Sequence, residues 1–263
     1  MSTSHYNTLD GYEKRAMREL NIWQRQMMQK PSYLNRLTAK LQYKMNSLIP
    51  ERVHQAITTT IKQMIRAVLF GAKHTTGEPM KEASLQAREV LIQERINFYK
   101  NTAAAEGGIT GAGGILLGLA DFPLLLSIKL KLLFEIASMY GYSVKDYRER
   151  LYILYIFELA FSSQEKRRVV YQQVLRWEEE YPGLPDDIHQ FDWRGFQQQY
   201  RDYIDLAKMA QLVPVIGAPV GVVVNYRLIS KLGKTAMNAY RMRWWTESTR
   251  LAGSGTGNLL KNE

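Results

Sequence analysis

The chain has 263 residues, no cysteine and a formal net charge of +10 at pH 7. This length is enough for one large domain or two small ones with a real hydrophobic core. The absence of cysteine excludes disulfides, cysteine nucleophiles and thiolate metal ligands, which fits a reducing compartment. Because no apolar stretch follows the first charges of the chain, we expect no cleaved secretory signal and a cytoplasmic location.

Positive charge gathers at both ends of the chain. Residues 1–75 hold twelve Lys or Arg against four acids, and residues 226–263 hold seven against two. Basic ends suit an anionic lipid surface, at roughly 1 kcal/mol for each Lys or Arg near the surface, or a nucleic-acid backbone. A basic helical face that is merely solvated explains the charge equally well.

Apolar residues recur at three- and four-residue steps in the N-terminal part, as in amphipathic helices. Asp10 is a candidate N-cap for the first helix, which we expect to end before Pro31. A second helix is expected up to Pro50, and a third directly after it. Residues 73–79 are predicted to form a loop, and residues 80–105 a long charged helix.

The helical pattern continues through the middle of the chain. Ser143 is expected to start a helix, and Ser162 with Glu165 forms the pattern of a capping box for the next one. Residues 181–193 break the periodicity and are predicted to form an acidic loop, after which Asp192 can cap a further helix. No sustained period-two alternation indicates strands.

These patterns predict an all-α fold class, with a single multi-helix domain that contains a buried pair of glycine-rich helices. Along the chain we expect basic amphipathic N-terminal helices over residues 1–75 and a helical core over residues 80–250. Residues 251–263 are expected to form a flexible tail, because they are rich in glycine and lie at a terminus.

Residues 102–128 set this chain apart, because their small residues fall four apart. In a helix this spacing makes a stripe without side chains, against which another backbone can approach closely. Each glycine costs up to ~1 kcal/mol of helix propensity relative to alanine, so we expect tight helix packing to compensate. Residues 212–240 repeat the theme with two prolines. The glycines expected to pack against neighbouring helices are Gly107, Gly111, Gly114, Gly118, Gly217 and Gly221.

Neither glycine-rich run makes a convincing membrane span, because Asp121 and Pro123 interrupt the first and residues 212–224 are too few. Two interpretations stay open. The runs are buried core helices, or they form a hairpin that dips into a bilayer or lines an apolar cavity, with Asp121 and Asn225 at its polar mouth.

Two cations and two tryptophans follow the second glycine-rich run. Paired tryptophans beside cations are typical of membrane interfaces. We therefore predict a membrane-surface set formed by Arg241, Arg243, Trp244 and Trp245. A tryptophan clamp buried in the core is an equally good interpretation.

No recognisable catalytic or metal-binding constellation occurs. The four histidines lie at unrelated positions without an H-E-x-x-H pair, no G-x-S-x-G elbow exists, and the glycines do not spell a dinucleotide fingerprint. Residues 233–235 imitate only the end of a phosphate-binding loop, which requires glycine where Leu228 stands. We expect no catalytic residue, metal or cofactor. The alternative is a hydrolase whose buried polar site lies near Asp121, Asn225 and Glu106.

Two segments, residues 102–142 and 214–243, resemble the EcsC family. Members of that family carry a glycine-rich segment leading to Asp-x-Pro, a helix with a Tyr-Gly-Tyr-like end, and later a Pro-x-x-Gly-Ala segment with an asparagine. The matching features here are residues 107–118, Asp121 and Pro123, Tyr140-Gly141-Tyr142, Pro214, Gly217-Ala218 and Asn225. The resemblance covers roughly residues 80–245. It implies a bacterial protein that is encoded with, or acts near, an ABC exporter without being its ATPase or its channel, and it carries over no catalytic residue.

The sequence therefore favours a non-enzymatic accessory or binding protein, peripheral on the inner face of the cell membrane. The partners we expect are an anionic membrane surface or a lipid, with a membrane transporter as a further candidate. Nucleic acid ranks last, because the chain has no helix-turn-helix signature and no aromatic platform.

Overall fold

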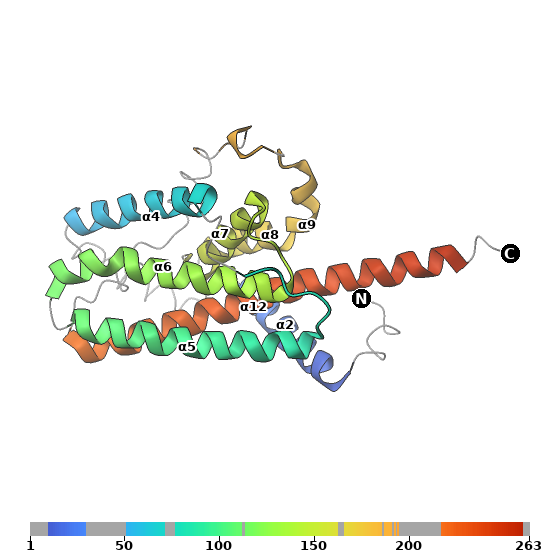
Figure 1. The fold of residues 1–263 in the computed structure, drawn as a ribbon, viewed down its shortest axis with the longest axis horizontal. Coiled ribbons are helices and arrows are strands. Elements are labelled where there is room, and N and C mark those ends of the chain that lie inside the picture. Colours follow the sequence, from blue (N-terminus) through green and yellow to red (C-terminus); the bar gives the residue numbers. More distant parts are fainter. Residues whose placement is uncertain are drawn as a thin grey trace.

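The computed structural model describes residues 10–29, 51–71, 77–111, 114–162, 166–185, 187–190, 192, 194 and 217–259. The side chains at several helix ends, including those of residues 104–111, 114–122 and 250–259, lie outside this description. Within the described residues the chain is helical and has no strand, so the predicted all-α single domain is confirmed (Figure 1).

The described helices, in chain order, are α2 (Gly11–Met28), α4 (Glu51–Gly71), α5 (Leu85–Gly111), α6 (Gly114–Tyr140), α7 (Tyr147–Phe161), α8 (Arg167–Leu175), α9 (Trp177–Glu180) and α12 (Gly217–Leu259). Two short 3-10 turns, η1 (Tyr181–Gly183) and η2 (Ile188–Gln190), lie where the sequence predicted an acidic loop. Of the loop expected over residues 73–79, the described residues 77–79 are not helical, and α5 begins later and runs further than expected.

A three-helix unit of α5, α6 and α12 forms the centre of the fold (Figure 1). The α5–α6 hairpin turns back at the same end of the molecule at which α12 begins. The packing of α12 against α5 is the most extensive of the described part, followed by that of α5 against α6. Helix α4 lies against α6 and α7, while α2 packs on α5, α8 and α12.

Helix α6 is apolar on more than one side because it has neighbours on several sides. It contacts α4, α5, α7 and α12. Its core residues Leu132, Leu133, Ile136 and Ala137 are fully buried. A helix that is apolar all round, instead of along one stripe, is what such a central position requires.

Helix α5 packs closely against α12 at Gly233. A Cβ atom added there would lie 2.6 Å from both Cδ1 and Cγ1 of Ile96 on α5. Only a residue without a side chain fits, because real Cβ contacts are longer than this. The sequence analysis had considered this glycine only as part of an imitation of a phosphate-binding loop.

The ends of three helices follow from local chemistry. Asp10 caps α2 as predicted, in a full capping box in which the Glu13 amide donates to Asp10 Oδ1 at 2.7 Å and the Asp10 amide donates to Glu13 Oε2 at 3.2 Å. Helix α7 is capped by Asp146 and not by Ser143. Helix α6 ends where Gly141 adopts a φ of 98°, a left-handed conformation that glycine tolerates best.

Some of the predicted boundaries differ from the structure or lie beyond the described part. The helix expected before Pro50, the helix capped by Asp192 and the glutamate of the Ser162 capping box all lie outside the described residues. The helix after Ser162 begins at Arg167, with Lys166 as an N-cap that makes no side-chain hydrogen bond. The α12 backbone is helical to Leu259 and so runs through residues 251–259 of the expected tail.

Candidate functional site

Of the three side chains predicted to form a polar cluster, only that of Asn225 is among the described residues. Asn225 lies on α12, is 1% exposed, and its Oδ1 atom has no hydrogen-bond partner within the described part of the chain. The side chains of Asp121 on α6 and Glu106 on α5 lie outside the described residues. The cluster therefore stays a prediction, and so does the hydrolase alternative that depends on it.

The six glycines that were predicted to pack against neighbouring helices all lie in helical backbone. Gly107 and Gly111 belong to α5, Gly114 and Gly118 to α6, and Gly217 with Gly221 to α12. Neither run is an open loop within the described residues. The contacts of these six glycines lie outside the description, so the glycine stripe itself stays a prediction.

Arg241, predicted to face a membrane, is buried between α2, α5 and α12. Its Nε and Nη2 atoms donate to the two carboxylate oxygens of Glu89 at 2.7 and 2.6 Å, and its Nη1 atom donates to Glu19 at 3.0 Å. The hydroxyls of Tyr12 and Tyr140 donate to the same Glu89 carboxylate at 2.6 and 2.7 Å. Desolvation acts to lower the pKa of Arg241, but the contacts with Glu89 outweigh it and hold the pKa above its usual value.

Arg243 is buried in a second network. Its guanidinium lies 3.7 Å from the ring centre of Tyr142 and 4.8 Å from that of Tyr152. It donates to Glu149 at 2.7 Å and to Glu178 at 2.6 Å. The charge is thus paired with two carboxylates and stacked on aromatic rings, as a buried arginine requires.

The prediction of a membrane-surface set is therefore wrong for Arg241, Arg243 and Trp245, all of which are buried. Trp244 is partly buried, and the guanidinium of Arg88 lies 5.2 Å from its ring centre. Adjacent residues point to several sides of a helix, and α12 has neighbours on several sides. Of the two tryptophans only Trp245 is buried, so the alternative of a tryptophan clamp in the core stays an interpretation.

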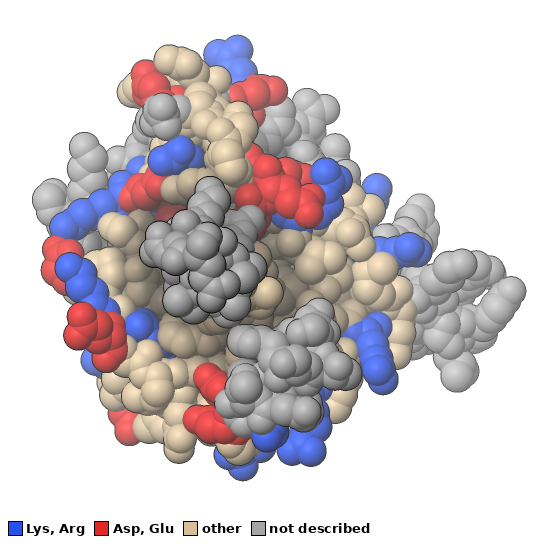
Figure 2. Space-filling view, turned by 90° about the vertical axis from the view of Figure 1, so that its right-hand side faces the viewer, with Lys and Arg blue, Asp and Glu red and all other residues tan. Residues whose placement is uncertain are grey.

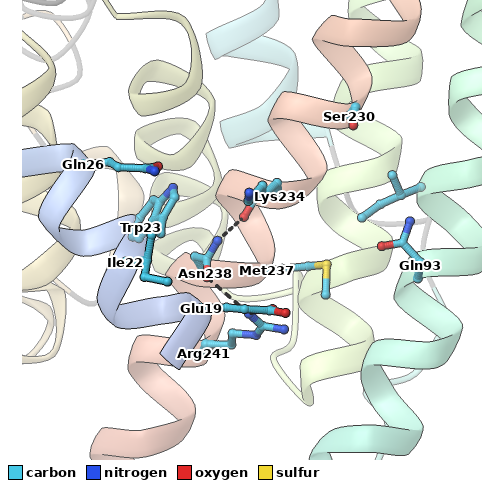
Figure 3. Close-up of a pocket in the computed structure, with 11 residues that line it drawn as sticks. Glu19, Ile22, Trp23, Gln26, Gln93, Ser230, Lys234, Met237, Asn238 and Arg241 are labelled. Carbon is cyan, nitrogen blue, oxygen red and sulfur yellow. Dashed lines mark hydrogen bonds and ion pairs between the residues drawn. The ribbon is translucent and has the colours of Figure 1, made fainter. Parts of the chain in front are cut away.

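A cavity of about 380 Å³ opens beside the Arg241 network, between α2, α5 and α12 (Figure 3). Its apolar lining consists of Ile22 and Trp23 on α2, Ile96 on α5 and Met237 on α12. The polar lining residues are Glu19, Gln26, Gln93, Ser230, Lys234, Asn238 and Arg241. A concave site with an apolar wall and a few polar groups is the usual form of a small-molecule pocket.

Two buried ionisable groups stand apart from both networks. Burial lowers the pKa of Lys129 on α6 to about 7, and the ammonium group donates to the Leu125 carbonyl at 3.2 Å. Burial also raises the pKa of Glu158 on α7 to about 9, and neither of its carboxylate oxygens has a hydrogen-bond partner among the residues that the structure describes. No group of three or more His, Asp or Glu suited to a metal ion occurs among the described residues.

The surface at the end opposite the α5–α6 turn carries mixed charge. Figure 2 shows Lys and Arg interspersed with Asp and Glu on this face, with apolar and polar uncharged residues between them. A basic face built for a phosphate backbone would show one sign of charge over a wide area. This end of the molecule therefore has no such field among its described residues.

The EcsC protein family model matches residues 14–245. The chain belongs to the EcsC protein family. It is 42% identical over 228 residues to Protein EcsC of Bacillus subtilis (strain 168), and the match covers 86% of this chain and 94% of that protein. It is also 24% identical over 249 residues to the uncharacterized protein YdbA of the same organism, with 86% and 90% of the two chains covered. No solved structure matches the chain.

The family match extends further than the resemblance seen in the sequence, which began near residue 80. It includes α2, whose Tyr12 lies just before the matched range and whose Glu19 lies inside it. Both buried arginines and their main partners, Glu89 and Glu149, lie within the match as well. The networks that hold α12 in the core are therefore part of the family region.

Sequence reasoning missed the four glutamates that pair with the two arginines. Glu89 and Arg241 are 152 positions apart, and Glu149 and Arg243 are 94 apart. A local pattern cannot show such pairs. The local sequence does not mark these glutamates either, because Glu89 follows Arg88 and Glu149 lies between Arg148 and Arg150, as on a solvated helix face.

Proposed function

We propose that the chain is a non-enzymatic peripheral protein that binds an anionic bilayer surface through one end of the three-helix unit. This apolar end comprises residues 98–111 of α5, 114–124 of α6 and 217–226 of α12. Figure 1 places these three segments together, where the α5–α6 hairpin turns back. The observation that carries the proposal is the exposure of large apolar side chains on all three helices at this end.

The exposed side chains are Phe98 on α5, Leu124 on α6, and Val223 and Tyr226 on α12. They are 55%, 48%, 47% and 43% exposed, respectively. Large apolar groups gathered at one end of a molecule mark a surface for a membrane or a partner. The three segments of the apolar end contain few charged residues, namely Lys100, Glu106 and Asp121.

The apolar end suits contact with a bilayer by helices that lie along its surface. From Phe98 to the end of α5 the helix rises about 20 Å, whereas the apolar face of an interfacial helix reaches a depth of only about 5–10 Å, so Phe98 and the helix end contact the bilayer together when α5 lies along it. No helix among the described residues has both the length and the apolarity needed to cross a bilayer. Lys100, whose ammonium lies 4.7 Å from the ring centre of Tyr226, and the exposed Arg227 flank this end. Each cation favours an anionic surface by about 1 kcal/mol.

Flotation with vesicles tests this proposal. The wild-type chain should float with vesicles of phosphatidylglycerol and phosphatidylethanolamine at low salt, and the double variant Phe98→Asp/Tyr226→Asp should remain unbound. The matched control, Val169→Asp/Leu175→Asp, places two aspartates at exposed apolar positions of α8 and should float like the wild type. Failure of the wild type to float, or equal loss in both double variants, would refute the proposal.

An ABC exporter as the partner at that membrane is a further part of the proposal, supported by the family resemblance alone. Cross-linking in cells from cysteines placed in the apolar end is the direct test, since the chain has no cysteine of its own. We expect a specific adduct with a membrane transporter from this end and none from cysteines at positions 169 and 175. Adducts that do not depend on position would count against a transporter partner.

A further inference from the structure

We propose that the cavity between α2, α5 and α12 binds a small zwitterion that carries a primary ammonium group, an anionic group and an apolar body. The cavity, of about 380 Å³, lies at the lower end of the range of about 300–1,000 Å³ seen for ligand pockets, so it suits a small molecule. The inference does not depend on membrane binding and concerns a different part of the molecule's surface.

The charges that line the cavity are balanced. Arg241 forms a bidentate pair with the fully buried Glu89 carboxylate, so this pair is neutral and its geometry is fixed. The charges left facing the cavity are those of Glu19, whose side chain is 56% exposed, and Lys234, which is exposed. Lys234 forms no ion pair with any described residue. One acid and one base that are both open to solvent match a ligand with one positive and one negative group.

The two charges come from different helices, because Glu19 lies on α2 and Lys234 lies on α12 (Figure 3). Arg241 Nη1 donates to Glu19 at 3.0 Å, which orients this carboxylate. A ligand ammonium would pair with Glu19 and a ligand phosphate or carboxylate with Lys234.

The remaining lining suits the rest of such a ligand. Trp23, Ile96 and Met237 form an apolar wall, and the amides of Gln26 and Gln93 with the Ser230 hydroxyl supply hydrogen-bonding groups. The Asn238 amide is already engaged, because it donates to the Lys234 carbonyl at 2.9 Å. Recognition therefore rests on Glu19 and Lys234, with the apolar wall contacting the ligand body.

This chemistry has two natural sources. One is a free zwitterion such as an amino acid with an apolar side chain, and the other is the head group of an ethanolamine phospholipid. Ser230 at the cavity lies one helical turn after Tyr226 of the apolar end, about 6 Å along α12. A bilayer lipid held at that end would therefore have a short path to the cavity.

Calorimetric titration in solution, without vesicles, tests the inference separately from membrane binding. The test ligands are leucine and dihexanoyl phosphatidylethanolamine, and dihexanoyl phosphatidylglycerol is the matched compound without an ammonium group. We expect one of the two zwitterions to bind at least tenfold more tightly than the glycerol compound. Leucine as the bound ligand identifies a free zwitterion as the source, and the ethanolamine lipid identifies a head group.

Substitutions of the two charged lining residues test whether the ligand binds in this cavity. Glu19→Gln keeps an oxygen that can accept from Arg241, and Lys234→Met changes an exposed side chain, so both should fold. Each should weaken the zwitterion at least tenfold, whereas Glu94→Gln and Lys131→Met, at exposed positions outside the cavity lining, should bind like the wild type. Binding of neither zwitterion, equal binding of the glycerol compound, or unchanged affinity in Glu19→Gln and Lys234→Met would overturn the inference.

Discussion

Replacing Arg241 with methionine should lower the free energy of unfolding by about 3–5 kcal/mol, because it leaves a buried carboxylate without its counter-charge. The side chain of Glu89 is fully buried and accepts two hydrogen bonds from Arg241, one from Tyr12 and one from Tyr140. The two hydrogen bonds from Arg241 to Glu89 join charged groups and contribute about 1.5–3 kcal/mol each, so their loss lowers the free energy of unfolding by a similar amount.

Urea denaturation followed by circular dichroism measures this loss. The double variant Glu89→Gln/Arg241→Met removes the buried charge as well and should be more stable than Arg241→Met alone. The control is Arg176→Met, which breaks an exposed pair with Glu179 and should cost less than about 1 kcal/mol. A loss below about 1 kcal/mol in Arg241→Met, or a double variant less stable than the single one, would show that the pair does not hold α12 in the core.

Three further substitutions test two buried ionisable groups and the contact of Gly233 with Ile96. Because burial raises the pKa of Glu158 to about 9, its contribution to stability is present at low pH and is lost as the pH rises toward 9. Glu158→Gln should therefore flatten the fall in unfolding free energy from about pH 5 to 9, and parallel curves would contradict this. Because burial lowers the pKa of Lys129 to about 7, its contribution is present above the unfolded pKa of about 10.4 and is lost as the pH falls through 7. Lys129→Met should gain stability relative to the wild type as the pH is lowered from about 9 to 6, in the same denaturation series. Gly233→Ala should lose about 1–3 kcal/mol through the clash with Ile96, while Gly11→Ala, which has open space at its Cβ, should stay within about 0.5 kcal/mol of the wild type. Equal stabilities of the two alanine variants would rule out a tight contact at Gly233.

The helices and part of the core were predictable because they depend on local spacing. The apolar stripe expected in the third helix is buried in α4 through Ile61, Met64, Ile65 and Val68. The capping box of Asp10 follows from a carboxylate three residues before Glu13, and both contacts lie within one turn of chain. The family resemblance likewise depends on short segments that can be read directly.

The residues around Arg241 and Arg243 show where local reading fails. Two arginines beside two tryptophans form a pattern shared by membrane-interface anchors and by buried networks, so the pattern does not distinguish them. The distinction depends on whether carboxylates from α5 and α7 reach the arginines. This is a property of helix packing across roughly a hundred residues.

The sequence by itself determined the helical class, the position of most described helices, the unusual glycine-rich segments and the membership of a family. These properties follow from periodicity, caps and motifs, which act within one or two turns of chain. The tertiary structure alone decided that Arg241 and Arg243 are buried, that exposed apolar side chains of three helices meet at one end, and that α2, α5 and α12 enclose a cavity. The physical reason is that burial and charge pairing are set by which helices pack together, and these helices are brought together from distant parts of the chain.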